Sequence, residues 1–121
     1  MVTRAISGSG GKKVYTEVKT LTASGGTLTI TCGFEPTKIF AYKLAVNNNT
    51  WATGSEVVIY DKAMNSTRQF RAYTSGTATL DNLDLTTANV SRFYNITSTS
   101  FDFGIPTGSS YAGTWYFVAV E

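Results

Sequence analysis

The side chains that could carry out chemistry are few in this sequence. The chain has no histidine, which removes the commonest general base and metal ligand, and Cys32 is its only cysteine, so a zinc site is nearly excluded. Carboxylates remain the one catalytic option. Asp61 and Asp102 each lie on an expected strand and would act as a glycosidase-type pair only if the fold brought them together. Because nothing in their spacing supports this, we expect no enzymatic activity, no metal and no cofactor.

Two other chemical features have ordinary structural explanations. The segment Asp81-Asn82-Leu83-Asp84 carries oxygen ligands at close spacing but lacks the pattern of a dedicated calcium loop. We therefore expect its polar side chains to cap their own backbone. Cys32 follows an apolar stretch and is expected to be a buried small hydrophobe, and a single cysteine forms no intrachain disulfide.

Four aromatic residues are the candidates for surface recognition. Trp51, Tyr73, Tyr94 and Tyr111 lie in or next to segments rich in Asn, Ser, Thr and Gly. Aromatic rings beside amides and hydroxyls bind sugars or other proteins in shallow sites. The alternative is that most of them are core or rim residues, with Trp51 folded back as a lid on the core. We expect at least one of the four to be a contact residue.

The composition indicates one small domain with a polar but weakly charged surface. The chain has 121 residues, of which 42% are hydrophobic and only 15% charged, and its net charge is +2. The basic residues are too scattered for a nucleic-acid footprint. No apolar run approaches the roughly 18 residues of a membrane span, and the N-terminus lacks the apolar stretch of a signal peptide. We therefore expect neither nucleic acid nor membrane as a partner.

The strand that should organise the fold is Thr114–Val120. Its residues are mostly aromatic or β-branched, and both of its alternating faces are apolar, with Trp115 and Phe117 on one and Tyr116 on the other. This pattern predicts a strand in the middle of a sheet with something packed over each side. The largely apolar segment Lys38–Val46 is its expected neighbour.

The remaining segments alternate over short lengths between turn signals, and no helix is predicted. We expect an all-β fold, an antiparallel β-sandwich of jelly-roll or immunoglobulin-like type, over residues 13–121. Threonines should line the exposed side of its first hairpin, and Thr77–Asn89 should be irregular chain with short strands. The expected pairs are Lys13–Thr22 with Thr27–Cys32 across a Gly-Gly turn, Ser55–Lys62 with Thr67–Thr74, and Ser91–Ile96 with Thr99–Phe103.

Residues 1–12 have the composition of a flexible linker and are expected to form an extended N-terminal arm. Such an arm either anchors the domain to a partner subunit or packs against its own domain. Its candidate assembly residues are Arg4, Ile6, Lys12 and Lys13.

Two stretches carry a resemblance to a known class of protein. Thr31–Phe40, reading Thr-Cys-Gly-Phe-Glu-Pro-Thr-Lys-Ile-Phe, and Trp115–Ala119, reading Trp-Tyr-Phe-Val-Ala, frame a polar β-rich middle. This pattern resembles the small β-sandwich modules of tailed-bacteriophage virion proteins, found in capsid decoration proteins, tail fibres and baseplates.

The resemblance implies a non-enzymatic virion structural protein, either a capsid decoration or a tail-associated surface protein anchored by its arm. It implies that the chain is made in the host cytoplasm, is located in the virion, and contacts other virion proteins. Self-association is expected, with a trimer preferred by analogy. The alternative is a module that binds carbohydrate or a host receptor, as in tail fibres and baseplates.

Overall fold

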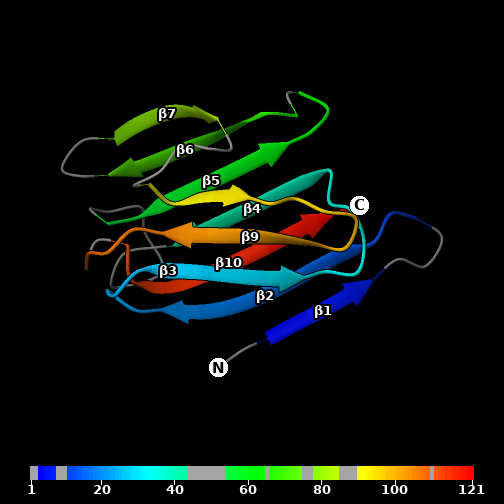
Figure 1. The fold of residues 1–121 in the computed structure, drawn as a ribbon, viewed down its shortest axis with the longest axis horizontal. Helices are drawn as coiled ribbons and strands as arrows, with labels where there is room; N and C mark the ends of the chain where they lie inside the picture. The colour runs from blue at the N-terminus through cyan, green and yellow to red at the C-terminus, as the bar shows by residue number, and fades with distance from the viewer. Residues whose placement is uncertain are drawn as a thin grey trace.

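The computed structural model describes residues 3–7, 11–43, 54–64, 66–74, 78–84, 90–109 and 111–121, with the backbone alone for 3–7, 74 and 78–84. These residues form two antiparallel sheets (Figure 1). The large sheet has seven strands in the order β1-β2-β10-β4-β5-β6-β7, and the small sheet has three in the order β3-β9-β8. The strands are β1 (Thr3–Ser7), β2 (Val14–Leu21), β3 (Gly26–Thr31), β4 (Lys38–Lys43), β5 (Glu56–Asp61), β6 (Arg68–Thr74), β7 (Ala78–Asp84), β8 (Arg92–Tyr94), β9 (Ser100–Ile105) and β10 (Gly113–Val120).

The predicted all-β class with antiparallel sheets is confirmed. None of the described residues is helical, so that part of the chain also contains no helix of the length and apolarity that a membrane span requires. Three of the expected neighbours are found: β4 beside β10, β5 beside β6, and β8 beside β9. The segment expected to be irregular contains the seven-residue strand β7, which pairs with β6.

The core lies between the two sheets and is built largely from aromatic rings. Phe103 of β9 is fully buried, and its ring centroid lies 4.9 Å from that of Trp115 and 5.0 Å from that of Phe117, both on β10. On its own sheet, Phe103 lies 5.4 Å from Phe93 of β8. The small sheet therefore packs face to face on the large one, as in a sandwich, and Phe103 is one of the residues at which they meet.

Strand β10 has the central position that the sequence predicts, but only one of its faces is covered. It pairs with β2 on one side and with β4 on the other. Trp115, Phe117 and Ala119 are buried beneath the small sheet, whereas Tyr116 and Val118 are only half-buried. The expectation that both faces are packed over is wrong for the described residues, and the outer face remains an apolar surface.

The predicted hairpin between the first two long strands is also wrong. β2 belongs to the large sheet and β3 to the small one, so the turn before Gly26 carries the chain from one layer to the other. Sequence alternation does not separate the two arrangements, because two strands bury their apolar sides equally well on one sheet or on facing sheets. The expectation that threonines line an exposed face is confirmed for β3, where Thr27, Thr29 and Thr31 are exposed.

A buried glutamine ties the two sheets together. Gln69 on β6 is 1% exposed, its amide nitrogen donates to the carbonyl of Phe93 at 3.0 Å, and its carbonyl oxygen accepts from the amide of Phe93 at 2.8 Å. The Gln69 side chain thus makes the two hydrogen bonds to Phe93 that a neighbouring strand would otherwise make at the free edge of β8. Both polar backbone groups of Phe93 are satisfied inside the core, as burial requires.

Cys32 is the buried small residue that the sequence predicts. It is 1% exposed, and its thiol donates to the carbonyl oxygen of Phe34 at 3.1 Å. Burial raises the pKa of the thiol above its ordinary value.

A thiol reagent is therefore expected to leave Cys32 unmodified in the native protein and to label it fully in urea. Because the folded pKa is raised, the unfolded chain loses the thiol proton first as the pH rises. The free energy of unfolding should fall as the pH passes through the ordinary thiol pKa, and the fall should be smaller in Cys32→Ala. Rapid labelling of the native protein would contradict this description of the site.

Candidate functional site

The outer face of the large sheet carries two rows of apolar side chains. The register places Val118, Phe40, Ile59 and Phe70 in one row across β10, β4, β5 and β6. It places a second row beside the first, with Val18, Tyr116, Tyr42, Val57 and Ala72. Together the rows cross five neighbouring strands, which is about 20 Å at a strand spacing of about 4.8 Å. We call these two rows the apolar face.

Large apolar groups on this face are in contact with solvent. Phe70 is 42% exposed and Tyr42 is 36% exposed. The rings of Tyr42 and Tyr116 stack with centroids 5.0 Å apart and an interplanar angle of 13°, which makes a flat aromatic surface on neighbouring strands. Isolated exposed apolar residues are ordinary, but a continuous patch of this kind is typical of an interaction surface.

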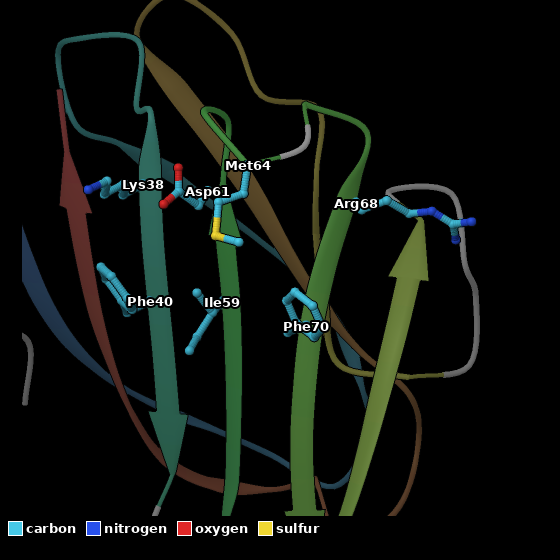
Figure 2. Close-up of a pocket in the computed structure, with 7 residues that line it drawn as sticks. All are labelled: Lys38, Phe40, Ile59, Asp61, Met64, Arg68 and Phe70. Atoms are coloured by element: carbon cyan, nitrogen blue, oxygen red, sulfur yellow. The ribbon is translucent and has the colours of Figure 1, made fainter.

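A groove lies at one end of the apolar face (Figure 2). It has a volume of about 150 Å³ and is lined by Lys38, Phe40, Ile59, Asp61, Met64, Arg68 and Phe70. Figure 2 shows Phe40, Ile59 and Phe70 side by side on three neighbouring strands, with Met64 from the β5–β6 turn above them. Met64 is 78% exposed, and a flexible thioether suits a surface that adapts to its partner.

The rim of this groove carries charges of both signs. Lys38 and Asp61 are directly opposite each other on β4 and β5, and Arg68 begins β6. Asp61 also accepts a hydrogen bond from the amide of Ala63 at 3.0 Å, which fixes the turn that presents Met64. Because the charges are mixed, another surface of the same composition can approach without net repulsion.

A second polar feature lies inside the sandwich, at the opposite end of β5 and β6. The Nε atom of Arg71 lies 2.5 Å from a carboxylate oxygen of Glu56, and both side chains are buried. Lys43 is buried beside them; its Nζ donates to the carbonyl oxygen of Ala112 at 3.3 Å. Burial lowers the pKa of Lys43, and the nearby Glu56 opposes this shift.

The structure brings two of the four predicted recognition residues together around this ion pair. The guanidinium carbon of Arg71 lies 3.9 Å from the ring centroid of Tyr73 and 5.8 Å from that of Tyr111. Tyr111 also packs against the hydrophobic core, and its carbonyl oxygen accepts a hydrogen bond from the indole of Trp115 at 3.0 Å. Both rings are half-buried at the rim of the sandwich.

Of the other two candidates, Tyr94 does not join this cluster. Tyr94 is on β8, on the outer face of the small sheet, where its hydroxyl hydrogen-bonds to Thr27. Trp51 lies outside the described residues.

The candidate assembly residues lie near the first edge of the large sheet. Arg4 and Ile6 belong to β1, which pairs antiparallel with β2, so residues 3–7 of the predicted arm form a strand of the large sheet. Lys12 and Lys13 are exposed just before β2. Anchoring through residues 1–12 stays a prediction.

The carboxylates considered at the outset do not form a pair. Asp61 lies at the groove on the large sheet, whereas Asp102 is on the outer face of the small sheet, where it accepts a hydrogen bond from Thr29 at 2.7 Å. The side chains of Asp81 and Asp84 lie outside what the structure describes. Among the described residues, no group of three or more His, Cys, Asp or Glu side chains is arranged to hold a metal ion.

The apolar face was missed by the sequence reasoning, although a signal for it was present. Phe40 and Ile59 alternate with buried apolar residues of β4 and β5, whereas Phe70 of β6 alternates with the buried polar residues Gln69 and Arg71. Two apolar faces were interpreted as burial on both sides for Thr114–Val120, and there the outer face is only partly buried.

Comparison with known proteins gives no assignment for this arrangement. No family model, no curated protein and no solved structure matched the chain.

Proposed function

We propose that this protein is a non-enzymatic structural protein of a bacteriophage virion, a capsid decoration or tail-associated surface protein that assembles with further copies of itself. The observation that carries the proposal is the apolar face, on which Phe70 and Tyr42 are exposed. The virion setting rests on the resemblance of Thr31–Phe40 and Trp115–Ala119 to phage β-sandwich modules. We also propose that the fold is a sandwich of jelly-roll or immunoglobulin-like topology.

A second copy is the occupant that the chemistry of the face favours. In a symmetric assembly the same surfaces meet repeatedly, so a patch of one sign repels itself. The groove rim instead carries Lys38 and Arg68 together with Asp61, so each copy supplies both partners for an ion pair. The chain as a whole is weakly charged at +2, which suits close packing of many copies. Two copies about a two-fold axis or three about a three-fold axis would both bury the face, and a trimer remains the preference by analogy.

Replacing Phe70 by glutamate is expected to dissociate the oligomer. The substitution places a charge at the β6 end of the apolar face, where its desolvation on association is unfavourable. The ring is 42% exposed, so the fold of each subunit should survive. Multi-angle light scattering across a concentration series should give an oligomeric mass for the wild type and a monomer mass for Phe70→Glu. Circular dichroism checks that the variant remains folded, and Tyr42→Ser provides a second test if it does not.

Thr31→Glu is the matched control, because it adds the same charge to an exposed strand position on the other sheet. It should keep the wild-type mass. A monomeric wild type at all concentrations, or equal dissociation by both variants, would contradict assembly through the apolar face. The virion setting is tested separately by peptide mass spectrometry of density-purified particles from the strain that carries the gene. Absence of the chain from those particles would overturn it.

The alternative function, a carbohydrate- or host-receptor-binding module, is favoured by a different surface. The outer face of the small sheet carries a tyrosine, an arginine and a hydrogen-bonded carboxylate and amide. This surface lies on the opposite side of the sandwich from the apolar face.

A further inference from the structure

The outer face of the small sheet is a flat polar surface built from two registered rows. The first row is Thr27 on β3, Gly104 on β9 and Arg92 on β8. The second row is Thr29, Asp102 and Tyr94 on the same three strands. Gly104 is the small residue at the centre, and it is buried although it is on the outer face. Something must therefore lie over it.

The group that covers Gly104 is the ring of Tyr94. A Cβ atom at position 104 would lie 3.0 Å from Cε1 of Tyr94 and 3.1 Å from an Nη atom of Arg92. The hydroxyl of Tyr94 reaches from β8 across β9 to Thr27 on β3, where the two hydroxyls hydrogen-bond. The ring therefore lies across the central strand with both ends held, and its side chain is half-exposed.

The guanidinium of Arg92 lies over this ring and uses only part of its donors among the described residues. Its guanidinium carbon lies 4.8 Å from the ring centroid of Tyr94, and one Nη atom donates to the carbonyl oxygen of Val90 at 3.2 Å. A guanidinium has five N–H donors in a planar fork that fits a carboxylate. Within the described part of the chain, no carboxylate side chain forms an ion pair with Arg92.

A carboxylate and an amide are held in place next to the ring. The two oxygens of Asp102 accept one hydrogen bond from Thr29 at 2.7 Å and one from the amide nitrogen of Asn95 at 2.9 Å. Asn95 is exposed and has a φ of 48°, in the left-handed region that asparagine tolerates better than most residues. Each carboxylate oxygen retains a further lone pair, and the amide retains its oxygen and a second N–H. The positions of both acceptors and donors are thus fixed before a ligand arrives.

We propose that these residues form a binding site for an acidic oligosaccharide, with Tyr94 as its platform. The face of the Tyr94 ring that Arg92 does not cover would pack against the apolar C–H face of a pyranose ring. The remaining groups on Asp102 and Asn95 would bind its hydroxyls, and the donors of Arg92 would bind the carboxylate of a uronic acid. The shared hydrogen bonds to Thr27 and Thr29 orient the site. This inference does not depend on self-assembly, because the site lies on the other outer face of the sandwich.

The site is tested with tri-galacturonic acid and, as the neutral comparison, the corresponding galactose trimer. Titration calorimetry should give saturable binding of the acidic trimer to the full chain and weaker binding of the neutral one. Arg92→Gln should lower the affinity for the acidic trimer by about tenfold, the usual effect of losing one charged hydrogen bond, and leave the neutral trimer unaffected. Tyr94→Ala should weaken the binding of both sugars.

Lys62→Gln is the matched control, because it removes the same charge from an exposed position on the β5–β6 turn. It should bind like the wild type. No saturable binding to the wild type, or an equal loss in Arg92→Gln and Lys62→Gln, would overturn the proposal. Gly104→Ala gives an independent check, since its Cβ would displace the Tyr94 ring and should reduce binding of both sugars. A monomeric protein that still binds the acidic trimer would contradict only the assembly proposal.

Discussion

Replacing Arg71 by methionine is expected to lower the free energy of unfolding by about 3–5 kcal/mol, the usual cost of removing one partner of a buried ion pair. Arg71 and Glu56 have side chains that are 6% and 3% exposed, and their contact is 2.5 Å. Methionine fills much the same space, so the loss comes from the carboxylate of Glu56, which is left buried without the guanidinium. Urea unfolding followed by tryptophan fluorescence measures the change.

The double variant Glu56→Leu and Arg71→Met separates the charge effect from packing. Removing both charges leaves neither a carboxylate nor a guanidinium unpaired, but the buried Lys43 loses the attraction of Glu56, so part of the lost stability should return. Lys62→Ala breaks the exposed ion pair with Glu35 and should have no measurable effect. If Arg71→Met alone is as stable as the wild type, the ion pair contributes nothing to the free energy of unfolding.

Replacing Phe103 by alanine is expected to lower the free energy of unfolding by about 3–5 kcal/mol as well, through a cavity between the sheets. The Phe103 ring contacts Trp115 and Phe117 on the large sheet and Phe93 on the small one. Its removal takes away aromatic contacts in both layers at once. Thermal and urea unfolding should both report the loss.

The control for this prediction is Met64→Ala, an exposed apolar residue on the β5–β6 turn. It should leave monomer stability unchanged. Phe103→Leu keeps part of the volume and should fall between the wild type and Phe103→Ala. If Phe103→Ala unfolds at the wild-type urea concentration, the sheets are not held together at this residue.

The parts of the fold that the sequence predicted well are those with a strong local signal. Alternation and apolar content identified β10 and its neighbour β4, and turn residues located the β5–β6 pair. The sequence did not predict that β2 and β3 belong to different sheets. Alternation shows which face of a strand is buried, but not the sheet to which the strand belongs.

The candidate sites were predicted only in part, for a related reason. Tyr73, Tyr94 and Tyr111 were selected by type, but Tyr94 and Tyr111 also have neighbours from distant segments. Tyr94, for example, hydrogen-bonds to Thr27, which lies 67 residues earlier in the chain. The buried pair Arg71 and Glu56 had no signal at all, since charged residues are normally expected at the surface.

The glutamine that joins the sheets also affects how the protein can associate. The free edge of a β-strand is a template on which another chain can add a strand. At β8 the backbone groups of Phe93 that would serve this purpose are already bonded to Gln69 from within the same molecule. Extension of the small sheet by an incoming strand is therefore blocked at this residue. At the β8 edge, contact with other molecules is therefore left to side chains, which favours defined neighbours over open-ended sheet growth at this edge.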